Sequence, residues 1–343
     1  MPVIEYKCPN CGGNMLFDGD SGMLTCESCG RQDNIEEKLD PIAQQVFEKD
    51  EAIEYQCTSC GAVLITNKDT SATVCSFCGS PVVLGDRLSG QLAPSMVIPF
   101  TVTEQEAIQA FRKWCKRGLL TPSGFMTADR IKEITGIYVP FWLYDLHHDA
   151  QVYGEGTKVR SYTRGDYHIT ETEYYDVYRR LKLNYVKVPV DAADKMDDTL
   201  MDKLEPFYYE HLKEFKTPYL SGYMAEKYSQ NDTQLLPRAK DKVAGYIRSA
   251  IQDSVSGYTT MNYSNQHITT THASARYVML PVWILTYDYN RQEHMFAMNG
   301  QTGKVVGKPP LSKLKLFSWF TGISAGTLLI LKLISLSMGG GFL

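Results

Sequence analysis

Eight of the nine cysteines lie in four CxxC pairs, and the arrangement of these pairs occurs twice. YKCPNCGGNMLFDGDSGMLTCESCG covers residues 6–30, and YQCTSCGAVLITNKDTSATVCSFCG covers residues 55–79, 49 positions later. Two thiolates in one tight turn can point at the same ion, and two such turns complete a tetrahedral four-sulfur site for Zn²⁺. The sequence therefore predicts two zinc ions, one bound by Cys8, Cys11, Cys26 and Cys29 and the other by Cys57, Cys60, Cys75 and Cys78.

The chemistry expected of these sites is structural. Four thiolates leave no open position on the metal, so the ion holds the fold together and does not catalyse. Each ribbon is too small for an apolar core of its own, so zinc supplies on the order of 10 kcal/mol of its folding free energy. A redox dithiol is less favoured, because it needs one CxxC at the start of a helix after a strand and here four occur in hairpin context. Disulfides are also less favoured, because the N-terminus MPVIEYKCPN does not resemble a secretory signal and the cytosol keeps thiols reduced.

A glycine follows the second cysteine of each pair and is expected to relieve the tight turn. These glycines are Gly12, Gly30, Gly61 and Gly79.

The charge of the cysteine-rich region argues against nucleic acid. Residues 1–90 contain six Lys and Arg against fourteen Asp and Glu, a net charge of −8, while the whole chain has −4. Each zinc with four thiolates adds a further charge of about −2. A nucleic-acid contact needs clustered Lys and Arg for the phosphates. A protein-facing role is therefore favoured, and a zinc-ribbon factor of transcription or replication is kept as the alternative.

Residues 92–308 are expected to form an α+β body with an antiparallel sheet. Thr103 and Glu106 form a capping-box pattern before a helix, and residues 236–255 have the apolar spacing of another helix. Residues 167–190 alternate as one or two long strands. Cys115 is interpreted as a small core residue.

A weak internal similarity connects YVPFWLYDL at 138–146 with MLPVWILTYDY at 279–289. A duplicated helix-plus-sheet unit would explain it, with repeats at 96–190 and 234–307. The two aspartates at the matching positions, Asp145 and Asp288, are candidates for a paired site, although capping or core hydrogen bonding is the favoured interpretation.

No catalytic constellation is evident in the sequence. His147 and His148 are neighbours, so in a strand their side chains face opposite ways and do not readily share a metal. GQTGKV at 300–305 lacks the spacing of a phosphate-binding loop. We therefore expect no enzymatic activity, no small-molecule substrate and no cofactor besides the two zinc ions. A hidden site in the strands that contain Asp145, His148 and Asp288 is the alternative.

The C-terminal stretch LFSWFTGISAGTLLILKLISL, residues 316–336, contains one charge. As a helix it measures about 31 Å, close to the hydrocarbon thickness of a bilayer. Four lysines lie between residues 304 and 315, and the positive-inside rule then places the N-terminal bulk in the cytoplasm. A buried or interfacial helix is the alternative.

The expected organisation is zinc ribbon 1 at 1–34, a linker at 35–53, zinc ribbon 2 at 54–86, the body at 92–308 and a single transmembrane helix at 314–337.

The combination of tandem ribbons, YVPFWLYD, LPVWILTYDYN with FAMNGQTGKVVG, and a single apolar tail resembles the YdjG-type zinc-ribbon membrane proteins of Gram-positive bacteria. Similar chains carry the label TFIIB-type zinc ribbon. The resemblance implies an adaptor of the envelope-stress system that acts beside an SPFH/flotillin-like protein and places a PspA-like protein at the cell membrane. The resemblance implies no enzymatic activity. The eight ribbon cysteines of this sequence match those of the family position by position.

Overall fold

A computed structural model gives the fold of the chain. It describes residues 3–36, 54–61, 63–65, 70–75, 78, 80–84, 93–116, 118, 120–122, 125, 133–194, 196–289 and 292–337. The predicted fold class is confirmed: two four-cysteine clusters, an antiparallel, sheet-rich body and one long apolar helix at the C-terminus. Most of the predicted linker, residues 37–53, lies outside the described residues.

Two very long strands form the centre of an eleven-stranded sheet. β10 (Glu133–Arg164) has 32 residues and β14 (Thr260–Tyr289) has 30, and they pair antiparallel from Glu133 opposite Thr286 to Thr157 opposite Thr260. β11 (Tyr167–Asp191) pairs with the other edge of β10 and forms a hairpin with it. The order along the main path of the sheet is β1-β8-β7-β13-β10-β14-β15-β16.

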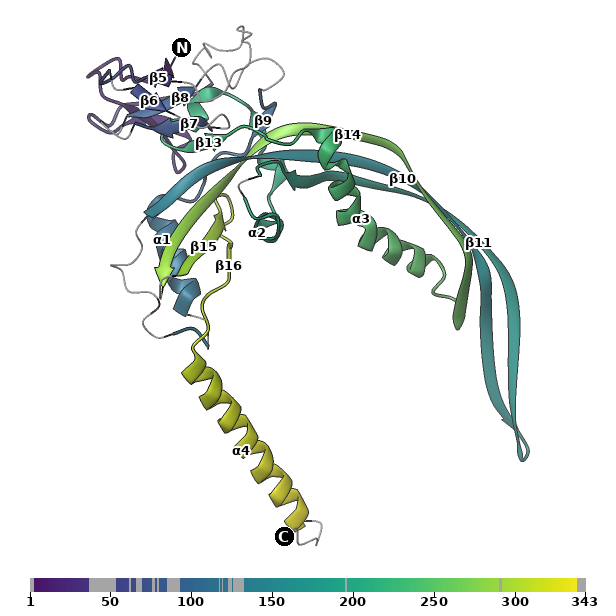
Figure 1. Cartoon of the computed structure of the whole chain (residues 1–343). Helices are drawn as coiled ribbons and strands as arrows, with labels where there is room; N and C mark the ends of the chain where they lie inside the picture. Colours follow the sequence, from purple (N-terminus) through teal and green to yellow (C-terminus); the bar gives the residue numbers. More distant parts are fainter. Residues whose placement is uncertain are drawn as a thin grey trace.

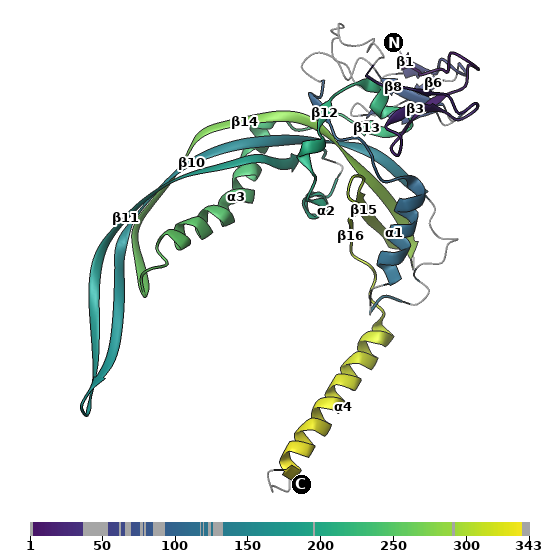
Figure 2. The same ribbon diagram turned by 180° about the vertical axis from the view of Figure 1, so that it is seen from behind.

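The sheet bends into an arch whose middle is covered on both faces (Figures 1 and 2). Most side chains of residues 137–146 and 277–285 are buried. Tyr138 and Met279 join the cluster that faces ribbon 1 and α1, while Val139 and Leu280 join a second cluster on the opposite face. Beyond the middle, β10, β11 and β14 continue as a narrow arm of mostly exposed residues.

The helices α1 and α3 lie against the sheet, one in each half. α1 (Glu104–Lys116) begins at the predicted capping box, in which the Thr103 Oγ1 and N–H contact Glu106 at 3.1 and 3.0 Å. α3 (Asp232–Ser254) packs on β11 and β10 and buries Val243, Ile247 and Ile251. Cys115 lies on α1 and is buried in the main core, as predicted.

The two similar sequence segments lie side by side in the centre of the sheet. Tyr138 is opposite Pro281, and Pro140 is opposite Met279. Each segment follows a helix and precedes an antiparallel partner strand, β11 in one half and β15 (Gln292–Asn299) in the other. The shared order of elements agrees with a duplication, which stays a prediction.

Residues 191–231 join the two halves with short elements. They contain α2 (Asp198–Leu204), the 3₁₀ turns η4 (Tyr209–His211) and η5 (Thr217–Leu220), and the strands β12 (Lys213–Glu214) and β13 (Met224–Glu226). After β15, Asn299 holds the turn to β16 (Val305–Gly307): its Oδ1 accepts from the backbone N–H of Gln301 and Thr302. Its Nδ2 donates to the carbonyls of Leu204 and Pro206, so the GQTGKV segment is a structural turn.

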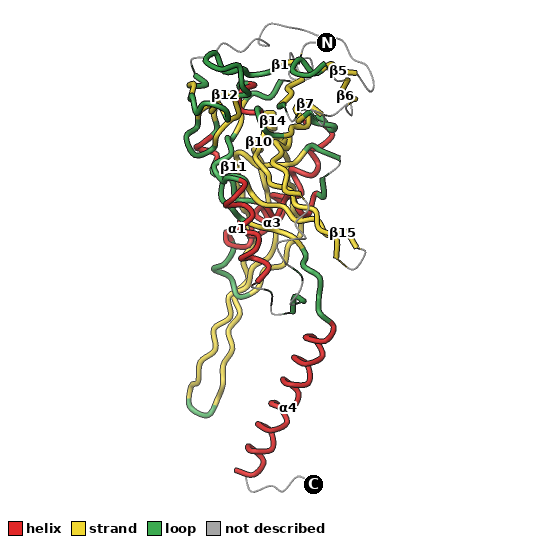
Figure 3. The backbone as a smooth tube through the Cα atoms, turned by 90° about the vertical axis from the view of Figure 1, so that its left-hand side faces the viewer, coloured by secondary structure: helices red, strands yellow, loops and turns green. Residues whose placement is uncertain are grey.

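The last element, α4 (Lys313–Ser337), leaves the body and extends away from it (Figures 1 and 3). A stretch of 22 residues, Lys313–Ile334, is long and apolar enough to cross a membrane, and none of it is buried in the protein. A core helix of this composition would be covered by other elements. Beyond its first turns, the helix therefore has no cover from the described part of the body.

Candidate metal centres

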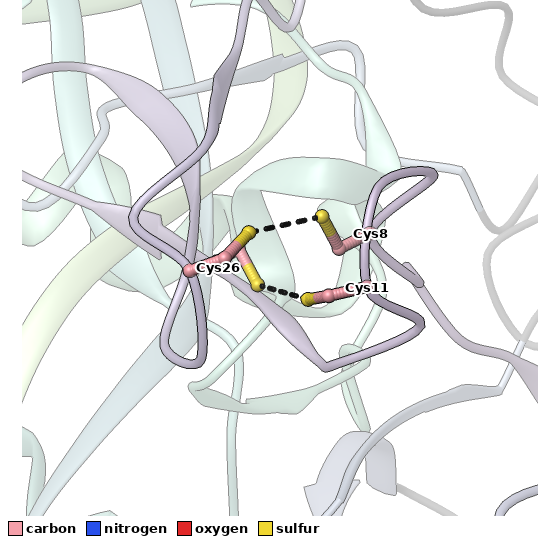
Figure 4. A group of neighbouring side chains, drawn as sticks. Cys8, Cys11 and Cys26 are labelled. Carbon is pink, nitrogen blue, oxygen red and sulfur yellow. Dashed lines mark hydrogen bonds between the residues drawn. The ribbon is translucent and has the colours of Figure 1, made fainter.

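The four sulfurs of each cysteine-rich ribbon converge on one point. In ribbon 1, Cys8 Sγ lies 3.6 Å from Cys29 Sγ, and Cys11 Sγ lies 3.5 Å from Cys26 Sγ. Figure 4 shows the side chains of Cys8, Cys11 and Cys26 directed toward this shared centre. In ribbon 2, the corresponding Cys57–Cys78 and Cys60–Cys75 distances are both 3.8 Å.

These distances fit a tetrahedral four-thiolate site. Zinc–sulfur bonds of about 2.3 Å place the sulfurs of a regular tetrahedron about 3.8 Å apart. All sulfurs of a cluster lie within 4.8 Å of one another, and the two clusters contain the eight cysteines named from the sequence. Each cluster can therefore hold one metal ion without rearrangement of its backbone.

The turns between the cysteines have the backbone that such a site needs. In ribbon 1 the Gly12 N–H donates to the Cys8 carbonyl at 2.8 Å, and the Gly30 N–H donates to the Cys26 carbonyl at 2.9 Å. Both glycines have positive φ, 75° and 71°, as does Gly61 of ribbon 2 with 76°. A side chain at these positions would strain the turn. Gly79 lies outside the described residues.

One thiol in each ribbon ionises far more readily than an ordinary cysteine. The backbone N–H of Arg31 lowers the pKa of Cys29 to about 6. The side chain of Ser80, together with its backbone N–H, lowers the pKa of Cys78 to about 6. Hydrogen bonds to sulfur stabilise the thiolate, and the thiolate is the form that binds a metal.

Ribbon 1 is packed into the main core of the protein. Its sheet consists of β2 (Met15–Asp18), β3 (Met23–Cys26) and β4 (Gln32–Asp33). The Phe17 ring lies 5.3 Å from the ring of Tyr219, and the Phe17 N–H donates to the Ser221 carbonyl at 3.0 Å. Two of the cysteines, Cys8 and Cys26, belong to the same cluster of buried residues as Phe17.

Ribbon 2 has a smaller core of its own. Tyr55, Val82 and Leu84 surround two of its cysteines in a separate cluster. Its strands are β5 (Glu54–Gln56), β6 (Val63–Ile65), β7 (Thr70–Val74) and β8 (Pro81–Leu84). β7 pairs with β13, so the hairpin β7–β8 extends the main sheet. Ala72 and Val83 of this hairpin belong to the main core and not to the small core of ribbon 2.

The two ribbons also touch each other. The first strand, β1 (Val3–Ile4), crosses from ribbon 1 and pairs with β8. The Glu5 carboxylate then accepts from the Ser59 N–H at 2.9 Å and the Ser59 Oγ at 2.8 Å. The Asn14 Nδ2 donates to the Ser80 Oγ at 3.2 Å. Sequence spacing did not reveal these contacts, because the partners are more than 50 residues apart and nothing in the cysteine pattern pairs the two ribbons.

The other site candidates from the sequence lie apart. The Asp145 carboxylate accepts from the Lys187 N–H at 2.8 Å and from Arg276 at 3.3 Å. Lys187 has a φ of 56° and lies where the register of the β10–β11 pairing shifts. Asp145 on β10 is opposite Ser274 on β14, and Asp288 lies fourteen residues farther along β14. That distance is about 46 Å along a strand. The two aspartates therefore form no paired site, and Asp145 has the hydrogen-bonding role that the sequence favoured.

The two histidines of the 147–148 pair face opposite ways, as expected in a strand. His148 is buried, and its Nδ1 lies 3.4 Å from the Thr270 Oγ1. Burial lowers the pKa of His148, and the charge of Lys240 adds to this effect. The His147 ring instead lies 5.3 Å from that of His272. None of the cavities lined by Phe111, Leu120 or Phe17 includes His147, His148 or Asp145.

Comparison with known proteins identifies a relative that spans the chain. The sequence is 61% identical over 340 residues to the uncharacterized protein YdjG of Bacillus subtilis (strain 168), with 99% of this chain and 100% of YdjG covered. No family model matches the chain. No solved structure matches it either.

Proposed function

The chain belongs to the YdjG family, and on this premise we propose that it is a membrane-anchored, cytosol-facing scaffold with two structural zinc ions. The ribbons and the arched sheet would present protein-binding surfaces, and α4 would hold them at the cell membrane. The chain would have no enzymatic activity. The observation that carries the proposal is an apolar helix that no other element covers, joined to a body with two metal clusters. Each cluster has four cysteine sulfurs, which leave no open position on a bound ion.

The junction between body and helix supports a fixed orientation at the bilayer. The Lys315 Nζ donates to the Thr121 carbonyl at 2.7 Å, and the Ser312 N–H donates to the Leu120 carbonyl at 2.8 Å. Leu120 also lines an apolar cavity of about 350 Å³ with residues of the first turns of α4, including Trp319. A tryptophan and lysines at one end of an apolar helix are typical of the membrane interface. The body would thus rest at the cytoplasmic surface.

Zinc is the metal that the donor set favours. Four thiolates in tetrahedral geometry suit Zn²⁺, which has no preferred d-electron geometry and no redox chemistry. The reducing cytosol, where the lysines next to α4 would place the ribbons, keeps such thiolates available. The proposed metal and the proposed topology therefore support each other.

The partners that we propose are a PspA-like protein and an SPFH/flotillin-like protein of an envelope-stress system. They come from the resemblance of the tandem ribbons, the FAMNGQTGK segment and the tail. The acidic ribbons and the exposed arm offer surfaces for such partners. An adaptor needs no catalytic group.

The alternative of a nucleic-acid factor finds little support on the ribbon surfaces. Among the described residues of both ribbons, the basic side chains are Lys7 and Arg31. The Lys7 Nζ lies 3.1 Å from Glu5, and the Arg31 Nε lies 2.8 Å from Asp33. Cations already paired with carboxylates contribute little to phosphate binding.

The test is chemical crosslinking of the full-length chain in its own membrane, followed by identification of the captured proteins. We expect PspA-like and SPFH-like proteins among them. The matched control ends at Lys315, which removes most of α4 and leaves both ribbons. It is expected to be soluble, to bind two zinc ions and to lose both partners. Capture of neither partner by the full-length chain would contradict the adaptor role, and a shift of DNA or RNA at low salt would favour the alternative.

A further inference from the structure

His147 and His272 face each other across the pairing of β10 with β14. The register places the two residues directly opposite, and their ring centres are 5.3 Å apart. Opposite residues of an antiparallel pair have Cβ atoms about 4.5–5.5 Å apart, so their side chains can hold a common ligand. His147 and His148 point to opposite faces of the strand, and His272 is therefore the imidazole that the fold brings beside His147.

The two imidazoles lie on the face of the sheet that α3 does not cover. Leu146 and Ala150 of β10 pack with α3 in one buried cluster, and His148 is also buried. Side chains alternate along a strand, so His147 lies on the other face. His147 is half-buried there and His272 is exposed. An ion from solvent can therefore reach both rings.

A bulge in β14 fixes the backbone next to this pair. His147 is opposite His272 and His148 is opposite Thr270, so Thr271 is an extra residue on β14. The Thr271 Oγ1 donates to the His147 carbonyl at 3.3 Å. Bulges redirect the side chains of a strand and are frequent next to functional sites. The hydrogen bond thus joins the two strands at the point where the imidazoles meet.

The separation of the rings fits two ligands of one metal ion. Zinc–nitrogen bonds of about 2.0–2.1 Å at tetrahedral angles place the centres of two ligating imidazole rings about 5.2 Å apart. The ring centres of His147 and His272 are 5.3 Å apart, with an angle of 66° between the ring planes. The last torsion of a histidine side chain is soft, so each ring can turn a nitrogen toward the shared point while the strands stay in place.

We propose that His147 and His272 form a third metal site, which binds Zn²⁺ through one nitrogen of each imidazole. Imidazole nitrogen is a common ligand of this ion, and two such ligands from adjacent strands need no change of the backbone. The site is separate from the two ribbons and does not depend on the span by α4.

The carboxylates on either side of His147 along β10 are already paired. Asp145, two residues before it, accepts from Arg276 at 3.3 Å. Asp149, two residues after it, lies 2.5 Å from Arg180. Neither carboxylate is free to complete the site, so water takes the other two positions of a tetrahedral ion. The third site is therefore open and exchanges its ion, whereas each ribbon surrounds its ion with four thiolates.

The test is equilibrium dialysis of the full-length chain, in detergent and with both ribbons loaded, against buffer that contains excess Zn²⁺. We expect three zinc ions per chain by metal analysis, and two after a second dialysis against zinc-free buffer. His147→Phe and His272→Phe each keep a ring at the contact and remove its nitrogens, so each variant is expected to hold two ions in excess Zn²⁺. Retention of the two ribbon ions shows that these variants are folded.

His267→Phe is the matched control. His267 is an exposed histidine on the same strand, but it is opposite Gln151 and has no imidazole across from it. This variant is expected to hold three ions, like the unaltered chain.

Two ions in the unaltered chain would overturn the inference and leave contact between the rings as the role of the pair. Three ions in both His147→Phe and His272→Phe would place the third ion elsewhere and would overturn it too. Loss of the third ion in His267→Phe would overturn it in favour of unspecific binding to surface imidazoles. Fewer than two ions in the unaltered chain would contradict the ribbon sites as well, which distinguishes a failure of the proposed function from a failure of this inference alone.

Discussion

The two ribbons share their cysteine spacing but differ in what surrounds the metal site. In ribbon 1, Cys8 and Cys26 belong to the main hydrophobic core. In ribbon 2, Cys57 and Cys75 lie in a cluster of five buried residues that is separate from the main core. The same metal-binding device therefore supports the whole body in one case and mainly a local unit in the other.

The difference comes from residues between the cysteines. At the shift of 49 positions, Phe17 corresponds to Thr66 and Leu24 corresponds to Thr73. Phe17 and Leu24 are buried against the body, at exposures of 4% and 0%. Threonines cannot supply the same apolar contact. The positions that the two copies share thus identify the metal ligands. The positions where the copies differ indicate which ribbon packs against the body.

The largest expected effect comes from removing one cysteine ligand from one site at a time and comparing the two variants. Cys26→Ser and Cys75→Ser are expected to lower the zinc content from two ions to one, since each site loses a thiolate. Each loss removes stabilisation on the order of 10 kcal/mol from its ribbon. We expect Cys26→Ser to lower the melting temperature of the body more, because its ribbon is part of the main core.

Metal analysis and thermal unfolding of both variants check this expectation. Cosedimentation with membrane should be unchanged for both, since α4 is intact. Equal melting temperatures for the two variants would contradict the difference between the ribbons, and an unchanged zinc content would contradict the assigned ligands.

The next effect tests the residue that distinguishes the copies. Phe17→Thr gives ribbon 1 the side chain that ribbon 2 has at the corresponding position, Thr66. Loss of the packing on Tyr219 is expected to reduce the free energy of unfolding by about 3 kcal/mol. Both metal ions should remain bound, because the cysteines are untouched. Denaturant unfolding measures the change, and a loss below about 1 kcal/mol would show that ribbon 1 is not held by this contact.

A smaller effect is expected at the hydrogen bonds between ribbon 1 and the body. The Ser221 Oγ donates to the Met15 carbonyl at 2.7 Å, and both residues are buried. Ser221→Ala leaves that carbonyl with one partner fewer, which costs about 1–2 kcal/mol. Hydrogen exchange of the β2 amides should accelerate, while the β5 amides of ribbon 2 serve as the internal control. Equal acceleration in both ribbons would argue against a local contact.

The smallest effect concerns an exposed ion pair between ribbon 1 and the body. The Lys216 Nζ lies 2.7 Å from Glu36, whose side chain is 62% exposed. The hydrogen bond and charge of Lys216 lower the pKa of Glu36 below its ordinary value. A lowered pKa contributes stability above the unfolded-state value, and this contribution is lost as the pH falls through the folded-state value.

Lys216→Ala is expected to cost less than about 0.5 kcal/mol near neutral pH, because solvent screens the pair. The difference from the unaltered chain should vanish in acid, where Glu36 is protonated in both. Unfolding curves at neutral and acidic pH measure this. A difference that grows in acid would have the wrong sign for this ion pair.

Local patterns predicted the parts of the structure that depend on neighbours in the sequence. The cysteine spacing named both clusters, the capping box at Thr103 and Glu106 placed the start of α1, and the apolar tail predicted α4. Residues 167–190 were expected as one or two strands and form the single strand β11. Each of these signals is contained within about 25 residues and has its own physical cause.

The remaining features depend on contacts between distant parts of the chain. The pairing of β1 with β8 and the entry of β7 into the main sheet join residues of both ribbons to each other and to the body. Nothing in the local sequence marks these pairings, because short strands have no register signal of their own. The length of β10 was also missed, since its arm beyond residue 157 is exposed on both faces and gives no core pattern.

The central claim is that the metal-bearing body lies in the cytoplasm and that α4 crosses the membrane. Protease digestion of intact protoplasts tests it most directly, with one epitope tag before Met1 and another after Leu343. We predict that the C-terminal tag is removed while the N-terminal tag and both ribbons survive until the protoplasts are lysed. Protection of both tags, or loss of both, in intact protoplasts would place the two ends on the same side and contradict the membrane-anchored scaffold.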